Sequence, residues 1–125
     1  MIAGIGIDIV DIARIEALLQ RHGMRFLQRI CTPGEIETCL GRHDVAACIA
    51  GRFAAKEAAF KALSAGRSSG IAFKEILVST AGANPRLHFT GKAHSRAGQL
   101  GIGRSHLSIS HDRGCAVAVV ILESA

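Results

Sequence analysis

The chain has 125 residues, a length that suits one domain with its own hydrophobic core. Hydrophobic residues make up 49% of it, which excludes a disordered chain, and no apolar run approaches the ~20 residues of a membrane span. The formal net charge of +5 indicates an acidic partner or a polyanionic ligand. The four cysteines form no CxxC pair and are expected to be reduced, mostly packing thiols of a cytoplasmic protein: Cys31, Cys39, Cys48 and Cys115.

Cap and turn signals divide the first half of the chain. The predicted elements are a buried strand over residues 2–10, helices over 12–22 and 24–31, a helix starting after Thr32, and a long helix from Asp44 to about Ala65. Asp11 and Asp44 are placed as N-caps, and Gly23 ends the first helix. The spacing of Thr32 and Glu35 is that of a capping box.

The second half reads as strands and one further helix. We expect a flexible loop over 66–70, strands over 76–80 and 87–90 joined by a turn over 81–86, a helix over 92–100, and a final hairpin that turns at residues 112–114. This order predicts one α+β domain over residues 1–125, with a mainly antiparallel sheet and a long central helix.

The stretch RFAAKEAAFKAL (52–63) places charged residues in an otherwise apolar helix. At about 100° per residue, Glu57 and Lys61 share the face of Phe53, whereas Arg52 and Lys56 are expected on a solvent-facing stripe. One reading is an exposed Glu–Lys pair that supports the helix by ~0.2–0.5 kcal/mol. The other reading is a partly buried face, where a charge persists only if it is paired or bound to a metal.

Two strands also carry polar residues beside apolar rows. In GIGIDIV the isoleucines alternate with Gly4, Gly6 and Asp8, so a backbone or a ligand can approach the glycine face closely. His111 ends an apolar row of the final hairpin. Taken alone, Asp8 is more often a cap or turn residue, and a lone histidine of this kind is more often a satisfied core residue than a catalyst.

Together these residues suit a particular chemistry. Two carboxylates, without a cysteine or histidine cluster at metal spacing, favour a hard cation, and Mg²⁺ takes one or two carboxylates with phosphate oxygens and water. Lysine and histidine nearby would serve phosphate binding and proton transfer. The pattern does not decide whether Asp8, Glu57, Lys61 and His111 meet in space.

The chain resembles the holo-[acyl-carrier-protein] synthases, the short bacterial type of 4′-phosphopantetheinyl transferase. Three blocks carry the resemblance: GIGIDIVDI, RFAAKEAAFKAL and SISHDRGCAVAVVIL, with the weaker block NPRLHFTGKA between the last two. They span nearly the whole chain. The loop SAGRSSGIAF and Cys115 depart from the family pattern, which affects expected loop contacts to the ligand and not the chemistry.

The resemblance implies the 4′-phosphopantetheinyl transferase fold and a Mg²⁺-dependent transfer of 4′-phosphopantetheine. The donor would be coenzyme A and the acceptor a serine of apo acyl carrier protein, giving 3′,5′-ADP and supporting fatty acid biosynthesis. Asp8 and Glu57 would bind Mg²⁺ and act in catalysis with Lys61, which would contact a phosphate or help to deprotonate the serine. The implied nucleotide-binding residues are Arg52 and His111 at the phosphates and Asn84, Pro85 and Arg86 at the adenine end, beside Lys61.

The resemblance further implies a homotrimer with active sites shared between subunits. For carrier-protein docking it favours an early arginine-bearing helix with Arg14, Arg21 and Arg25. Arg21, Arg25 and Arg29 recur every four residues, so they can line one side of a helical segment. A solvated basic face is the alternative. Arginine suits an acidic partner because its planar fork pairs bidentately with carboxylates.

Three other functions are weaker alternatives. A basic nucleic-acid module is disfavoured because the chain has no Tyr or Trp and no known binding motif. A serine hydrolase built on Ser110 and His111 lacks a GxSxG elbow, and adjacent strand residues face opposite ways. A trimeric scaffold without activity would be separated from a transferase by an activity measurement.

Overall fold

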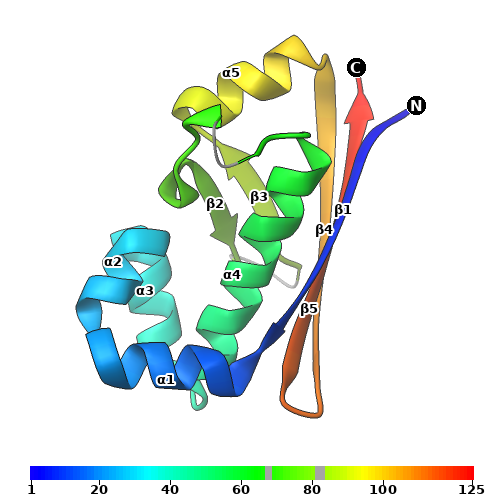
Figure 1. The fold of residues 1–125 in the computed structure, drawn as a ribbon. Coiled ribbons are helices and arrows are strands. Elements are labelled where there is room, and N and C mark those ends of the chain that lie inside the picture. Colours follow the sequence, from blue (N-terminus) through cyan, green and yellow to red (C-terminus); the bar gives the residue numbers. More distant parts are fainter. Residues whose placement is uncertain (67–68, 81–83) are drawn as a thin grey trace.

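The computed structural model describes residues 1–66, 69–80 and 84–125, which form an α+β fold (Figure 1). The strands are β1 (Ile2–Asp11), β2 (Ile76–Ser79), β3 (Arg86–Phe89), β4 (Ile102–Asp112) and β5 (Cys115–Ser124). The helices are α1 (Ile12–His22), α2 (Met24–Ile30), α3 (Pro33–Leu40), α4 (Val45–Ala62), the 3-10 helix η2 (Phe73–Glu75) and α5 (Gly91–Gln99). The α+β class and the element order predicted from the sequence are confirmed.

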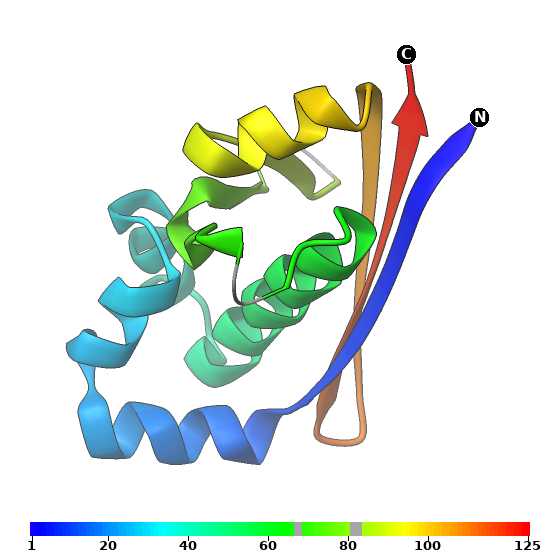
Figure 2. The same cartoon turned by 45° about the horizontal axis from the view of Figure 1, so that its top comes forward.

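Two antiparallel sheets flank the central helix α4. The larger sheet has the strand order β1-β5-β4, and β2 pairs with β3 in a second, two-stranded sheet. Figure 2 shows α4 lying along the larger sheet, with α1 to α3 beyond its N-terminal half and α5 across the other end of the fold. The chain ends lie side by side, because Ser124 donates its backbone N–H to the Met1 carbonyl oxygen at 2.9 Å.

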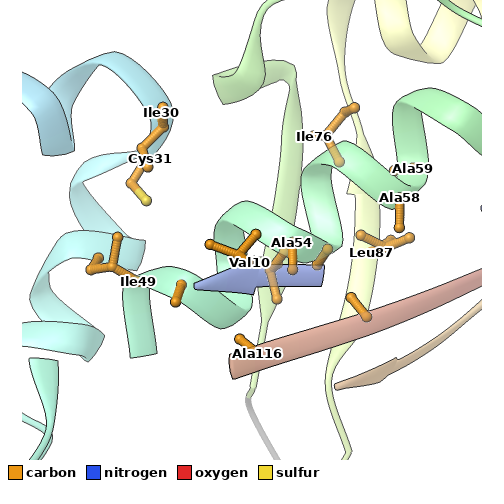
Figure 3. Close-up of a cluster of buried hydrophobic side chains, with 14 of the residues drawn as sticks. Val10, Ile30, Cys31, Ile49, Ala54, Ala58, Ala59, Ile76, Leu87 and Ala116 are labelled. Carbon is orange, nitrogen blue, oxygen red and sulfur yellow. The ribbon is translucent and has the colours of Figure 1, made fainter. Parts of the chain in front are cut away.

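The contact between β1 and α4 depends on two glycines. A Cβ atom on Gly6 would lie 1.8 Å from the Ala58 carbonyl oxygen, and one on Gly4 would lie 2.0 Å from that of Ala62. Alanines on the facing side of α4 complete this close approach, which only residues without large side chains permit. The same helix forms the middle of the apolar cluster in Figure 3, between Ile49 and Ala59.

The prediction that β1 is a buried strand is wrong for the face of the strand that carries its isoleucines. Ile5, Ile7 and Ile9 are 59%, 57% and 66% exposed, because the glycine face of the strand and not the isoleucine face packs on α4. In the register of the sheet, Ile7 lies beside Val119 of β5. The larger sheet therefore presents an apolar outer face.

Helices α1, α3 and α4 start where their cap residues predict. Asp11 caps α1, the Thr32–Glu35 capping box starts α3, and Asp44 caps α4 through the backbone N–H of Ala47 at 3.0 Å. Gly23, with φ of +55°, ends α1, and α2 then begins as a separate helix. Helix α4 ends at Ala62, a little earlier than predicted.

The prediction that all four cysteines are reduced thiols is wrong. Cys39 near the end of α3 and Cys48 near the start of α4 are joined by a disulfide, whereas the sequence predicted reduced thiols. The short segment between the two helices folds back and brings their Cα atoms to 5.4 Å, within the range a disulfide spans. Cys31 and Cys115 are free, and burial raises the pKa of the Cys31 thiol to about 11, which leaves it unreactive at neutral pH.

The second half of the chain follows the prediction with small shifts. The final hairpin turns at residues 112–114 as expected, and β4 begins earlier than the predicted hairpin did. The predicted loop over 66–70 and the predicted turn over 81–86 fall partly on residues 67–68 and 81–83, outside the described part of the structure. No helix within the described ranges is long and apolar enough to cross a membrane.

Candidate active site between β1 and α4

The C-terminal half of α4 brings three of the predicted site residues to one place. The Lys61 ammonium lies 3.2 Å from Asp8 Oδ1 and 2.8 Å from the Ile7 carbonyl oxygen, so it joins α4 to the carboxylate strand. Glu57, one helical turn before Lys61, lines a cavity together with it. The glycine face of β1 permits this approach of helix and strand.

The cavity has a volume of about 530 Å³ and one largely aromatic wall. Phe73 of η2 packs against Phe53 and Phe60 of α4, with ring centroids 5.6 Å and 5.3 Å apart. The lining residues are Phe53, Glu57, Phe60, Lys61, Ala65, Gly66, Ile71 and Phe73. An apolar wall that ends at a carboxylate and an ammonium suits a ligand with an apolar part and an anionic part.

Asp8 and Glu57 fit a magnesium ion in type and number. Groups of three or more histidine, cysteine, aspartate or glutamate side chains suited to a metal do not occur in residues 1–66, 69–80 and 84–125. The protein would therefore supply two carboxylates, and water and ligand oxygens would complete the coordination, as is characteristic of Mg²⁺. Zinc or an iron–sulfur cluster would need ligands that are not present here.

The predicted solvent-facing stripe of α4 is wrong. Lys56 and Arg52 are 0% and 5% exposed, because α4 is covered on nearly all sides. The Lys56 ammonium donates to Glu35 Oε1 at 2.8 Å and to two backbone carbonyl oxygens. A helix with apolar residues on all sides is typically buried, so the composition of α4 already indicated that Lys56 and Arg52 would be buried.

Arg52 lies on another side of α4 from Glu57, about 140° away at ~100° per residue. Its guanidinium donates to the Thr80 hydroxyl at 3.3 Å, and its buried Nε has no hydrogen-bond partner among the described residues. Burial, and next the nearby Arg42, lower the pKa of Arg52. Ser79 pairs with Arg86 across the smaller sheet, so Arg52 lies near the start of β3. An anion placed here would satisfy the buried guanidinium.

His111 lies near the N-terminal half of α4. Its Nε2 is 3.0 Å from the Ala47 carbonyl oxygen, and Gly51 leaves room for the imidazole ring. Along the helix, Ala47 precedes Glu57 by about 15 Å, taking ~1.5 Å per residue. One chain therefore does not bring His111 to Asp8, Glu57 and Lys61. Ser110 is exposed on the outer face of β4, consistent with the weakness of the hydrolase alternative.

The remaining predicted residues lie at the surface. Asn84 and Arg86 are exposed and Pro85 is half-buried, all at the start of β3. Arg14 and Arg21 are exposed on α1, where a spacing of seven residues puts them on one side. Arg25 and Arg29 are exposed on α2. The prediction of one helical row from Arg21 to Arg29 is wrong, because Gly23 breaks the helix between them.

The fold is that of a known transferase class. The chain belongs to the 4′-phosphopantetheinyl transferase superfamily, whose family model it matches over residues 4–119.

The named proteins to which the chain is similar are holo-[acyl-carrier-protein] synthases. The chain is 48% identical to the holo-[acyl-carrier-protein] synthase of Koribacter versatilis, over 98% of this chain and 99% of that protein. It is similar to the crystal structure of the Neisseria meningitidis synthase, with a TM-score of 0.89, 34% identity and coverage of 99% and 100% of the two chains. For the Helicobacter pylori synthase in complex with coenzyme A, the TM-score is 0.83 at 39% identity, with coverage of 95% and 99%.

Sequence reasoning missed several residues that shape the site. Glu35, which pairs with Lys56, was noticed only as part of a capping box, and Phe73 and Thr80 were not singled out. Their partners lie on α4, between 13 and 28 positions away in the sequence, and no local pattern links them. The one usable signal was the buried character of α4, which requires a counter-charge for Lys56.

Proposed function

We propose that this protein transfers 4′-phosphopantetheine from coenzyme A to a serine hydroxyl of apo acyl carrier protein. The observation that carries the proposal is the contact of Lys61 with Asp8 beside an apolar cavity that Lys61 and Glu57 line, in a chain of this family. The synthases that it resembles act on carrier protein by name, and the Helicobacter pylori synthase binds coenzyme A. The proposal includes a cytoplasmic role in fatty acid biosynthesis, where both substrates are used.

In this reaction the serine oxygen forms a bond to the phosphorus that carries pantetheine, and the bond from that phosphorus to 3′,5′-ADP breaks. The hydroxyl proton is released to solvent water, and the leaving phosphate gains negative charge. Asp8 and Glu57 would hold Mg²⁺, which when bound neutralises charge on the pyrophosphate and orients it. Lys61 is placed to donate to a phosphate oxygen as the charge develops there. The apolar wall would exclude water from this end of the donor.

The nucleotide residues support a homotrimer with shared sites. Arg52 lies on another side of α4 from Glu57, and His111 of β4 lies against the N-terminal half of α4, so a ligand held by all of them needs two copies of the chain. The exposed isoleucine face of β1 continues across β5, and an apolar patch of this kind marks an interface. Closed symmetric assembly would cover this face and bring the nucleotide residues of one subunit to the carboxylates of the next.

The transfer is tested by mass spectrometry of an apo carrier protein incubated with this protein, coenzyme A and Mg²⁺. The carrier protein should gain one phosphopantetheine group. Asp8→Ala and Glu57→Ala should each reduce turnover severely at limiting Mg²⁺ while circular dichroism stays unchanged, and Glu37→Gln, an exposed carboxylate on α3, should not. A wild-type protein that leaves the carrier unmodified contradicts the proposal.

The shared site is tested by mixing inactive variants. Asp8→Asn and His111→Ala chains, refolded together, should regain part of the activity, because some sites then combine two intact halves. Ile7→Glu should break the assembly to monomers in light scattering, whereas Gln20→Glu on α1 should leave it intact. Absence of complementation in mixed trimers, or a monomeric wild type, rules out the shared site.

A further inference from the structure

A buried ion pair lies directly behind the cavity. The Lys56 ammonium, 0% exposed, uses its three protons on Glu35 Oε1 at 2.8 Å, the Ile30 carbonyl oxygen at 2.6 Å and the Phe73 carbonyl oxygen at 3.1 Å. These acceptors come from α3, the end of α2 and η2. One ammonium therefore fixes three separate segments against α4.

The Glu35 carboxylate extends the same network. Its Oε2 accepts from the Val78 N–H at 2.9 Å, and its Oε1 also accepts from the Thr32 N–H at 2.8 Å. Val78 lies in β2, two residues before Thr80, the hydroxyl partner of Arg52. The pair thus connects the start of α3 and strand β2 to the central helix.

Stability alone does not account for this pair. Desolvation of two charges offsets much of their attraction, and replacement of a buried pair by apolar residues of similar size is often neutral or stabilising. What such a pair does supply is fixed geometry, because every proton and lone pair has one partner position. The ion pair therefore matters for the positions of the segments that it holds.

Phe73 connects the Lys56–Glu35 ion pair to the cavity. Its carbonyl oxygen accepts from Lys56, and its half-buried ring packs on Phe53 and Phe60 in the aromatic wall. The 3-10 helix that carries Phe73 has only three residues and cannot fix its own position. Lys56 is also the neighbour of Glu57 in the sequence, so the same turn of α4 holds the wall and presents the carboxylate.

We infer that Lys56 is a positioning residue: its bond to the Phe73 carbonyl sets the aromatic wall against which the pantetheine arm of the donor lies. The inference rests on the proposed function. With the pyrophosphate at Glu57 and Lys61, the uncharged pantetheine arm is the part of coenzyme A that matches an apolar wall. The product 3′,5′-ADP has no such arm and does not use the wall.

The test compares coenzyme A with 3′,5′-ADP in a variant that removes both charges, Glu35→Gln with Lys56→Met. The glutamine keeps one oxygen that can accept from Val78 or Thr32, and methionine fills the space of the lysine stem, so the fold should persist at reduced stability while the Phe73 carbonyl loses its partner. Calorimetry should give a Kd for coenzyme A about tenfold higher and a Kd for 3′,5′-ADP unchanged. If this variant does not fold, Lys56→Gln, which keeps a donor for Glu35, takes its place.

Two further variants separate positioning from general destabilisation. Phe73→Ala should weaken coenzyme A binding to the same degree, and combining it with the pair variant should add little, because both act through one ring. Ile15→Val removes a methyl group from a fully buried position in α1 and should lower stability while leaving both affinities unchanged.

The outcomes are distinct. Equal weakening of both ligands, additive effects with Phe73→Ala, or a similar loss in Ile15→Val overturns the inference. A wild type that modifies the carrier protein while the pair variant binds coenzyme A normally overturns the inference alone. A wild type that neither binds coenzyme A nor modifies the carrier overturns the proposed function as well.

Discussion

Lys61 of α4 contacts Asp8 of β1, with Nζ 3.2 Å from Oδ1 and 54% of the lysine side chain exposed. The ammonium therefore neutralises part of the charge on a carboxylate that we propose for Mg²⁺. A cation bound to Asp8 would be repelled by the lysine unless the flexible side chain moved toward a phosphate. In the protein without substrate, Lys61 would then compete with a bound cation for Asp8.

This competition predicts opposite effects of Lys61→Met on two measurements. The affinity of the substrate-free protein for Mn²⁺, used as a spectroscopic substitute for Mg²⁺, should rise by up to about fivefold, because an exposed charge interaction contributes ~0.2–1 kcal/mol. Turnover should fall, because the developing phosphate charge loses its partner. Lys74→Met, an exposed lysine on η2, is the control and should change neither. A Mn²⁺ affinity that stays the same or falls in Lys61→Met contradicts the competition.

The close packing of β1 on α4 predicts contrasting effects of two glycine substitutions. Gly6→Ala should lower the free energy of unfolding by about 3 kcal/mol or more, since its Cβ would lie 1.8 Å from the Ala58 carbonyl oxygen and backbone would have to move. Gly34→Ala in α3 meets no atom within 4 Å and should stabilise by about 0.5–1 kcal/mol through helix propensity. Urea unfolding of both variants checks this. Equal effects would mean that the glycine contact does not limit the packing.

Glu75 predicts an acid-sensitive region at the start of α5. Bonds from the backbone N–H of Ala72, and further from those of Lys92 and Ala93, hold the pKa of the Glu75 carboxyl below its ordinary value of 4.5. A lowered folded-state pKa contributes stability that is present above about pH 4.5 and is lost as the pH falls through the lowered value. Wild type should therefore melt at a higher temperature than Glu75→Gln at pH 7, and the difference should shrink toward pH 3. A difference that is constant over this range would exclude the carboxylate as its source.

The order of elements was predictable from local signals. Asp11, Thr32 and Asp44 act within three residues of themselves, and their helix starts are confirmed. The hairpin turn at 112–114 is local in the same way. The direction in which β1 faces was not predictable: alternation shows that a strand has two faces, but which face meets α4 depends on the close fit of Gly4 and Gly6 to the alanines.

The site was predictable in residue type and only partly in arrangement. Asp8 and Lys61 are in contact although they are 53 positions apart in the sequence, whereas the resemblance implied a phosphate or the acceptor serine as the partner of Lys61. Burial of Lys56 was missed, because its counter-charge Glu35 and its acceptor Phe73 come from segments that meet α4 only in the folded chain. The separation of His111 from Glu57 within one chain also depends on tertiary structure, since no local pattern in the sequence relates the final hairpin to the long helix.

We propose that the exposed arginines of α1 and α2 form the docking surface for the acidic carrier protein. Arg14 and Arg21 form one row on α1, while Arg25 lies beyond the helix break at Gly23. Charges at the rim of an interface mainly raise the association rate and are screened over ~8 Å at physiological salt. Arg14→Glu and Arg21→Glu should therefore raise the KM for carrier protein about three- to tenfold and flatten its dependence on salt.

The KM for coenzyme A is the internal control for these variants, because none of the residues proposed for the donor lies on α1 or α2. It should stay unchanged in Arg14→Glu and Arg21→Glu. Arg25→Glu tests whether the docking surface continues onto α2, and the same rise in the KM for carrier protein is expected there. An unchanged KM for carrier protein after reversal at Arg14 and Arg21, or a loss of coenzyme A affinity instead, would show that the carrier docks elsewhere.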